Sequence, residues 1–176
     1  MMRTSLPKVM PSEHIFIPDP ANQRVFRNAL GAFTTGVTVV SAMTRDGPTG
    51  MTVNSFASVS LDPPLVLWSA ARNSARHDLF TAADHYAIHV LGADQYMLSA
   101  RFTRGGLGFE GLGWEENEDG VPIISGTLAR FECRRYTLHE AGDHTIVIGR
   151  VLRAAQREGE PLCFSRGTFG RFAVEG

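Results

Sequence analysis

The sequence predicts a mainly β protein, an antiparallel β-barrel with a few flanking helices. Short runs rich in β-branched and apolar residues recur along the chain, at 37–43, 65–71, 86–91 and 144–155. Helical patterns are few and do not alternate regularly with these runs, so the sequence does not favour a parallel α/β sheet. A length of 176 residues is enough for one domain with a sizeable core.

The composition excludes several classes of protein. Hydrophobic residues make up 43% and charged residues 20% of the chain, as in ordinary globular proteins. The formal net charge of -1 gives no basic face for phosphate backbones, so we expect no nucleic-acid partner. No apolar run approaches the roughly 18 residues of a membrane span, and the N-terminus shows no secretory signal. We therefore expect a cytoplasmic protein with no membrane partner.

The chain divides into an arm and one domain. Residues 1–18 contain three prolines and little periodicity, and we expect them to form an arm that is loose or drawn onto a partner subunit. A single domain is expected over 19–176. It opens with a helix, capped by Asp19 and with Pro20 in its first turn, that places five apolar residues on one face: Val25, Phe26, Ala29, Leu30 and Phe33.

Two further helices and a long loop are predicted in the middle of the chain. One helix is expected over 73–84, with Asn73 or Ser74 as its cap, and a second over 93–102. The segment 103–120 is rich in glycine and acidic residues, and its composition predicts a loop.

Two of the predicted strands also carry an expectation about burial. The run 65–71 is almost continuously apolar and is expected to be covered on both faces. The segment 127–138 alternates and predicts a strand with one solvated face, which carries Arg130, Glu132 and Arg134.

Three patterns that can indicate cofactor or metal binding are better explained by structural roles. A GxGxxG pattern occurs at Gly106, Gly108 and Gly111. It follows a predicted helix instead of a strand, so we interpret it as loop and not as a dinucleotide fingerprint. His85 and His89 would share a face of a strand but have no third ligand nearby, and we expect no metal. The two cysteines lack metal-type spacing and are interpreted as small buried hydrophobes: Cys133 and Cys163.

The most informative stretch is 48–64, where uncharged polar side chains alternate with apolar ones. Its hydroxyl and amide residues are Thr49, Thr52, Asn54, Ser55, Ser58 and Ser60. A solvated strand face usually carries lysine, glutamate or arginine, and here no charge occurs before Asp62. One interpretation is an amphipathic strand whose wet face consists of hydroxyls. The other is the wall of a site for a large planar polar ligand, such as an isoalloxazine ring with its ribityl chain.

Sequence motifs over most of the chain resemble those of one family. FRNALGAFTTGVTVVSA (26–42), GMTVNSFASVSLDPPLVL (50–67), GDHTIVIGRV (142–151) and PLCFSRGTFGRF (161–172) are similar to the short-chain flavin reductases that serve two-component flavin monooxygenases. The resemblance runs over about 22–172, in the order and spacing of that family. It implies an FMN-binding split barrel of six antiparallel strands, normally a homodimer with flavin sites near the subunit interface.

The resemblance also implies which residues bind flavin. The flavin-binding segment of the family matches Thr49, Gly50, Met51, Thr52, Asn54 and Ser55. Gly50 would let the main chain approach a ring closely. Residues that border the flavin tail match Ser69, Ala70 and Ala71, and phosphate-side contacts match Arg76, Arg101 and Phe102.

The nicotinamide side of the site is implied by two further motifs. Asp143 and His144 match the GDH motif near the nicotinamide, and His144 is the predicted catalytic residue. The nicotinamide-nucleotide region matches Ser165, Arg166 and Gly167.

The function that follows is an NAD(P)H:flavin oxidoreductase. It would reduce FMN or FAD with NADH or NADPH by hydride transfer and supply reduced flavin to a partner monooxygenase. Hydride transfer depends on stacking and orientation of the two cofactors, so no protein nucleophile or metal is required. Two alternatives have the same fold: a flavoprotein that holds FMN tightly for another substrate, and a non-catalytic flavin-binding module. A third is an interaction domain whose hydroxyl-rich strand is mere surface.

Overall fold

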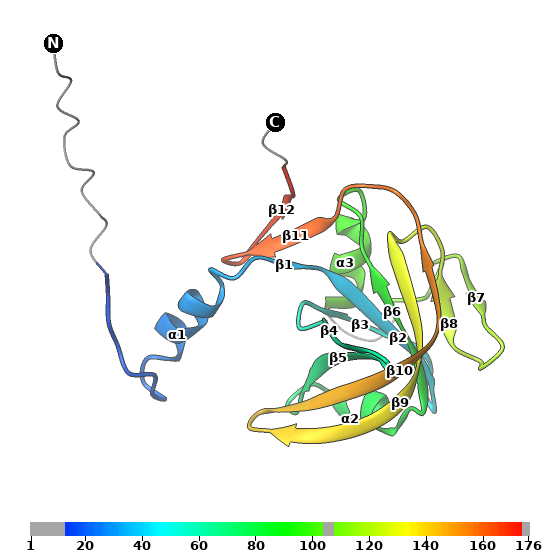
Figure 1. Cartoon of the computed structure of the whole chain (residues 1–176), viewed down its shortest axis with the longest axis horizontal. Helices are drawn as coiled ribbons and strands as arrows, with labels where there is room; N and C mark the ends of the chain where they lie inside the picture. The colour runs from blue at the N-terminus through cyan, green and yellow to red at the C-terminus, as the bar shows by residue number, and fades with distance from the viewer. Residues whose placement is uncertain (1–12, 104–107, 174–176) are drawn as a thin grey trace, which may run out of the picture.

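The computed structural model describes residues 13–103 and 108–173, and nearly half of them lie in antiparallel strands (Figure 1). Within these ranges three helices flank the sheets: α1 (Gln23–Leu30), α2 (His77–Ala82) and α3 (Tyr96–Thr103). Within the described ranges, none of the helices is long and apolar enough to cross a membrane. The predicted arm lies largely outside the described residues, and the division into arm and domain stays a prediction.

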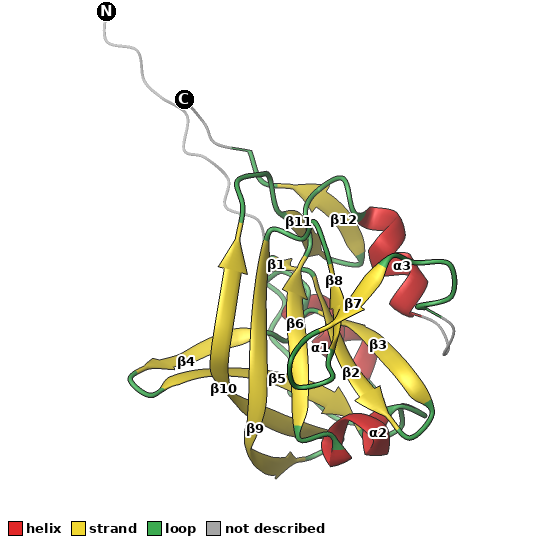
Figure 2. Ribbon diagram, turned by 90° about the vertical axis from the view of Figure 1, so that its right-hand side faces the viewer, coloured by secondary structure: helices red, strands yellow, loops and turns green. Residues whose placement is uncertain are grey.

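One large sheet forms the barrel. Its strand order is β3-β2-β6-β9-β10-β5-β4, and all pairs are antiparallel. The strands wrap around a common interior (Figure 2). The sheet holds seven strands, one more than expected, because β4 extends it beyond β5. The bounds are β2 (Thr38–Thr44), β3 (Gly47–Val53), β4 (Ala57–Leu61), β5 (Pro64–Ala71), β6 (His85–Val90), β9 (Ala129–Ala141) and β10 (His144–Gln156).

The barrel is split between its two edge strands. In the part of the chain that the structure describes, β3 pairs only with β2 and β4 only with β5, so no ladder there closes the sheet on itself. The connector from β3 to β4 spans the gap, and Ser55 in that connector accepts a hydrogen bond from the Ser69 backbone N–H at 2.9 Å. The hydroxyl-rich segment therefore lies along the split.

Two smaller sheets complete the fold. β1 (Thr35–Gly36), β11 (Leu162–Ser165) and β12 (Thr168–Arg171) form one of them, and β7 (Trp114–Glu116) pairs with β8 (Pro122–Ile124) in the other. The expectation of a loop over 103–120 is therefore wrong for Trp114–Glu116. Acidic residues obscured this strand, which is held by pairing with the apolar β8.

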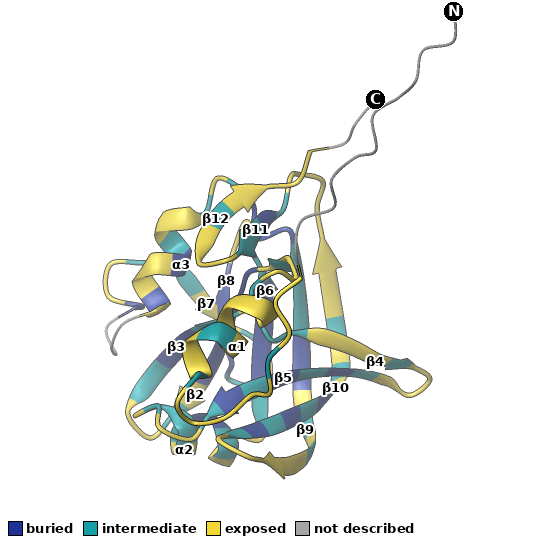
Figure 3. Ribbon diagram, turned by 90° about the vertical axis from the view of Figure 1, so that its left-hand side faces the viewer, coloured by how far each residue is buried: buried dark blue, intermediate teal, exposed yellow. Residues whose placement is uncertain are grey.

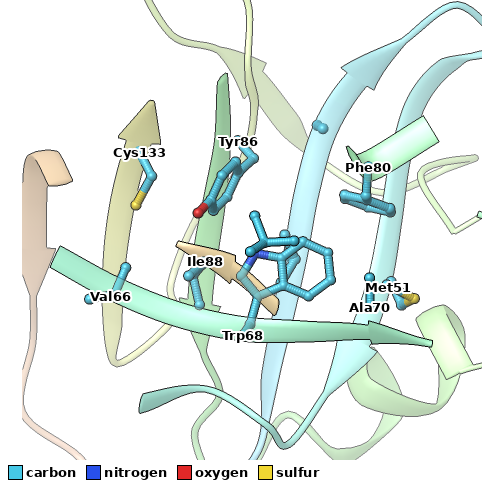
Figure 4. Close-up of a cluster of buried hydrophobic side chains, with 11 residues drawn as sticks. Met51, Val66, Trp68, Ala70, Phe80, Tyr86, Ile88 and Cys133 are labelled. Carbon is cyan, nitrogen blue, oxygen red and sulfur yellow. The ribbon is translucent and has the colours of Figure 1, made fainter. Parts of the chain in front are cut away.

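The barrel interior is filled by apolar side chains around Trp68. This side chain is fully buried and meets Phe80 and Tyr86 edge to face, with ring centroids 5.5 and 6.1 Å apart (Figure 4). In β5 the residues Val66, Trp68 and Ala70 are buried, whereas those between them are only partly covered. The expectation that this strand is covered on both faces is therefore wrong for its outer face, because only the side chains of the inner face pack into the barrel core.

A second apolar cluster lies outside the barrel, under α3. Phe102 is 1% exposed and packs edge to face on Phe109. A Cβ on Gly50 or on Gly108 would lie within 2.4 Å of the Phe102 ring, so both glycines are required for this close packing. Gly108 of the GxGxxG pattern thus serves packing, and Gly106 lies outside the described residues.

The prediction that one face of β9 is solvated is wrong for Glu132, which is only 5% exposed. Arg153 on β10 and Asn117 both donate hydrogen bonds to its carboxylate, at 2.8 and 2.7 Å, and Arg130 lies 2.9 Å away. Burial alone would raise the pKa of Glu132, but these hydrogen bonds and charges together lower it. A charge is tolerated here because partners from other elements neutralise it.

Of the two histidines on β6, the buried one, His89, has a structural role. Ser41 donates to the Pro122 carbonyl at 2.6 Å, so its oxygen accepts from His89 Nε2 at 2.9 Å. Burial and the charge of Arg130 lower the pKa of His89 to about 3, and the ring stays neutral. Over 13–103 and 108–173, no group of three side chains is arranged to hold a metal ion.

All three helices begin later than predicted, and α3 begins at Tyr96 instead of residue 93. Asp19 accepts the N–H groups of Ala21 and Asn22, so it holds a turn, and α1 begins only at Gln23. α2 begins at His77 without a side-chain cap.

Among residues 13–103 and 108–173, nothing covers the apolar face of α1. No α1 residue is buried, and Leu30 and Phe33 are 58% and 79% exposed. The helix stands away from the barrel in Figure 1, and Figure 3 colours most of it as exposed.

Candidate functional site

A cleft of about 540 Å³ lies where the end of β3 faces α3 and the small β11–β12 sheet. This volume is within the usual range for small-molecule sites. Its walls are mainly apolar and aromatic. The lining residues are Val37, Thr52, Val53, Asn54, Tyr96, Ala100, Thr103, Phe164 and Phe169.

The polar groups of the cleft come from β3, α3 and the connector after β3. Thr52 and Thr103 both donate their hydroxyls to the Ser99 carbonyl, at 2.6 and 2.8 Å, which leaves their oxygen lone pairs as acceptors. The Asn54 side chain makes no hydrogen bond with any residue of 13–103 or 108–173. Its amide can therefore both donate to and accept from a ligand.

Aromatic rings separate this cleft from a second hollow of about 520 Å³. Phe169 lies between Tyr96 and Phe164, with both ring-centroid distances 5.0 Å. Tyr96 and Phe169 line both spaces, and the second hollow also includes Gly167 and Arg171. Two ligands bound in these spaces would share one aromatic wall.

The first three predicted flavin-binding residues are buried in the fold. The Thr49 hydroxyl bonds locally to Thr44 and to the Gly47 carbonyl. Met51 belongs to the barrel core, and Gly50 packs against the ring of Phe102. The ring that approaches Gly50 closely is therefore a protein side chain.

The next predicted residues lie on or beside the split. Thr52 and Asn54 line the cleft, whereas Ser55 bonds to the backbone of Ser69 across the gap. Ala70 is fully buried in the barrel core, and Ala71 at the end of β5 is half-buried.

Both predicted phosphate-binding arginines donate to backbone carbonyls. Arg76 Nη1 bonds to Gly50 O at 2.7 Å and Phe102 O at 2.9 Å, and its Nη2 bonds to Thr103 O at 3.3 Å. Arg101 Nε bonds to Gly108 O at 2.7 Å. The Phe102 side chain is buried, so only its backbone could meet a ligand.

The predicted nicotinamide-nucleotide residues form the turn between β11 and β12. Arg166 and Gly167 have positive φ values of 49° and 81°, as a tight turn requires. The Arg166 N–H and the Ser165 hydroxyl both donate to Gly31 O, at 2.8 and 3.3 Å, so this turn is fixed to the end of α1. Arg166 itself is exposed.

His144 lies at the start of β10, opposite Ala71 of β5. Its Nδ1 is 2.7 Å from the Asp143 carboxylate, and this hydrogen bond lowers the pKa of Asp143. The His144 side chain is 42% exposed and is not part of the cleft lining, so the structure does not bring it together with Thr52 and Asn54.

Comparison with known proteins decides the family. The flavin reductase-like domain matches residues 30–173 of the chain. An FMN reductase (NADH), SmoA, of Agrobacterium fabrum is 70% identical over 164 residues, which cover 93% of this chain and 94% of the relative. The chain belongs to the flavin reductase-like family.

Other members of the flavin reductase-like family agree in sequence and structure. The NADH:FAD oxidoreductase SgcE6 of Streptomyces globisporus, solved with NAD and FAD fragments, superposes with a TM-score of 0.83 at 40% identity, over 90% of this chain and 98% of that one. A probable flavin reductase of Rhizobium meliloti is 44% identical over 83% of this chain, which spans only 48% of that longer relative. These relatives confirm the split-barrel fold and an NAD(P)H-dependent oxidoreductase that reduces flavin.

Sequence reasoning missed the aromatic wall of this flavin reductase. The sequence predicts Tyr96 only as part of a helix, and Phe164 and Phe169 only as part of the PLCFSRGTFGRF motif, with Phe164 in a predicted strand. They meet because β11 and β12 fold back beside α3, a contact between segments about 70 residues apart. No local pattern signals such a contact; the aromatic residues in the PLCFSRGTFGRF motif were the available hint.

Proposed function

We propose that the cleft beside Thr52 and Asn54 binds the flavin ring, and that this flavin reductase prefers FMN and NADH. The observation that carries the proposal is that the uncharged polar segment and three aromatic rings line one cavity of suitable size. The preference for FMN and NADH rests on the relative at 70% identity, which is named for that pair.

The lining residues suit a planar polar ring. The aromatic and aliphatic side chains would cover its faces, while the Asn54 amide and the hydroxyl oxygen of Thr52 would bond to its polar edge. The second hollow would take the outer part of the nicotinamide nucleotide, because it includes Gly167 and shares Tyr96 and Phe169 with the cleft. The nicotinamide ring itself would have to reach past these two side chains into the cleft and stack on the flavin ring. When both are bound, the nicotinamide supplies a hydride to the flavin, and the protein contributes orientation and exclusion of water.

The activity is tested by steady-state kinetics with the four combinations of FMN or FAD and NADH or NADPH. NADH oxidation should stay at the background rate until flavin is added, and FMN with NADH should have the highest kcat/KM. If saturating FMN and FAD both leave the rate at background, reductase activity is wrong for this chain. A purified protein that is pale favours flavin as a diffusing substrate, whereas a yellow one supports the tight-flavoprotein alternative.

The flavin site is tested by Asn54→Ala. Loss of its hydrogen bonds to the ring should weaken FMN binding about five- to tenfold, corresponding to about 1 kcal/mol. Quenching of flavin fluorescence measures the dissociation constant. Asn28→Ala on exposed α1 is the matched control and should bind as the wild type does. An unchanged constant for Asn54→Ala would place the ring elsewhere.

A flavin-dependent monooxygenase is the proposed recipient of reduced flavin. A relative from Acinetobacter baylyi, 43% identical over 83% of this chain, is named the reductase component of trigonelline monooxygenase, and this chain spans 48% of its length. Release of the product to such a partner requires only moderate affinity for flavin. A cytoplasmic location, where NADH is supplied, is part of the same proposal.

A homodimer is also proposed. Leu30 and Phe33 are exposed next to the β11–β12 turn, and Val59 and Leu61 are 45% and 95% exposed on the projecting β4–β5 hairpin (Figure 3). A second copy of this chain would cover these apolar side chains, which a monomer leaves in water.

A further inference from the structure

Arg76 contacts two elements that meet at the cleft. It lies at the start of α2 and is half-buried. Its guanidinium donates to Gly50 O on β3 at 2.7 Å, and to Phe102 O and Thr103 O on α3 at 2.9 and 3.3 Å. One side chain therefore joins three carbonyls that belong to two different elements.

The three carbonyls belong to an edge strand and to the C-terminal end of a helix. Phe102 and Thr103 are the last two residues of α3 as described, and backbone carbonyls at this end of a helix carry the negative end of its dipole. Gly50 is on β3, which has β2 as its one sheet neighbour within 13–103 and 108–173. A half-buried cation with several donors is well suited to all three carbonyls. Burial lowers the pKa of Arg76, yet an arginine stays charged at any physiological pH.

The elements that Arg76 joins are two adjoining walls of the cleft. Thr52 on β3 and Thr103 on α3 both line it. Two other contacts bring the walls together: the Thr52 hydroxyl bonds to Ser99 O at 2.6 Å, and the Phe102 ring occupies the space of the missing Cβ on Gly50. The Arg76 hydrogen bonds lie beside these contacts and complete the junction.

We propose that Arg76 is a positioning residue that fixes α3 against β3 and so sets the width of the cleft, instead of binding the phosphate of the flavin. Nη1 already donates twice, and one donor of Nη2 is also used. Turning the guanidinium toward a phosphate would break its hydrogen bonds to the carbonyls of Gly50 and Phe102, which are both buried residues, and this is costly. The inference rests on the proposal that this cleft holds the flavin ring.

The test compares FMN with riboflavin, which has the same ring but no phosphate. Arg76→Ala should weaken both ligands at least fivefold, with the ratio of their dissociation constants unchanged within twofold. Arg76→Lys, which keeps a cation and can reach some of the carbonyls, should restore part of the affinity for both. Arg45→Ala removes an exposed positive charge elsewhere and should leave both constants unchanged.

A second measurement needs no ligand. Hydrogen–deuterium exchange of the α3 amides should become faster in Arg76→Ala and recover partly in Arg76→Lys. If Arg76→Ala weakens FMN but not riboflavin, or if α3 exchange is unchanged, the positioning role is wrong. If the wild type binds neither flavin, the proposed function fails, and the exchange result still decides whether Arg76 fixes α3. If Arg76→Ala does not fold, Arg76→Lys is compared with the wild type in the same two ways.

Discussion

Strand β2 and helix α1 are neighbours in the sequence, both rich in apolar residues, yet they differ completely in burial. β2 buries five residues in succession, Thr38 to Ala42, whereas α1 buries none. Alternate residues of β2 face different clusters: Val40 packs into the barrel core and Val39 into the cluster under α3. Both faces of the strand are thus covered by this one chain.

The difference teaches that an apolar pattern predicts an element but not what covers it. In β2 the covering elements are β5, β6 and α3 of the same chain, so both faces of this strand are buried within one subunit. For α1, the described part of the chain offers no cover. The stability of the barrel and the burial of α1 should therefore respond to different substitutions and to different conditions.

The largest effect is expected in the barrel core. Trp68→Ala removes a fully buried indole and should lower the free energy of unfolding by about 3–5 kcal/mol. Phe33→Ala, next to α1 and 79% exposed, should change it by less than about 0.5 kcal/mol at a low protein concentration. Urea unfolding measures both. Equal losses in the two variants would contradict the contrast between barrel and α1.

Much of the fold was predictable because the barrel strands have local signatures. The runs 37–43 and 86–91 were recognised from their β-branched residues, and they match β2 and β6 closely. β7 was missed because its acidic residues resemble a loop, and Glu132 was assigned to solvent because its partners lie on other segments. Contacts between distant segments determine both the strand β7 and the burial of Glu132, and a local sequence pattern does not indicate such contacts.

The candidate site was predictable in part, for the same reason. The uncharged polar stretch after Gly50 pointed to Thr52 and Asn54, which line the cleft. The resemblance suggested a ligand role for Arg76, whereas its hydrogen bonds to three carbonyls depend on how α3 packs on β3. The direction in which a side chain donates is a property of the folded chain.

A smaller effect is expected on the pH dependence of stability, through the buried and neutral His89. The folded state keeps His89 unprotonated because its pKa is lowered to about 3, whereas the unfolded chain binds a proton below about pH 6.5. The contribution of this residue is therefore fully present above pH 6.5 and is lost as the pH falls. Between pH 7 and pH 5 it should amount to about 2 kcal/mol.

His89→Gln provides the comparison, since glutamine can still donate to Ser41 but does not titrate. The variant should be less stable than the wild type at pH 7, and its free energy of unfolding should fall about 2 kcal/mol less between pH 7 and pH 5. Urea unfolding at both pH values measures this difference. If the free energies of unfolding of the two proteins change equally with pH, the pKa of His89 is not lowered in the folded state.

The smallest effect on the single subunit is expected at α1, and it is the one that tests the second copy. Leu30→Ser combined with Phe33→Ser alters only exposed side chains, so unfolding of a dilute monomer should change by less than about 0.5 kcal/mol. If a second copy covers this face, the same change removes apolar contacts at the interface and shifts the protein toward monomer in sedimentation velocity. Arg24→Ser, also exposed on α1, is the control and should sediment as the wild type does. A wild type that is monomeric at every concentration would contradict the homodimer, and a dimer unaffected by the double change would place its interface away from α1.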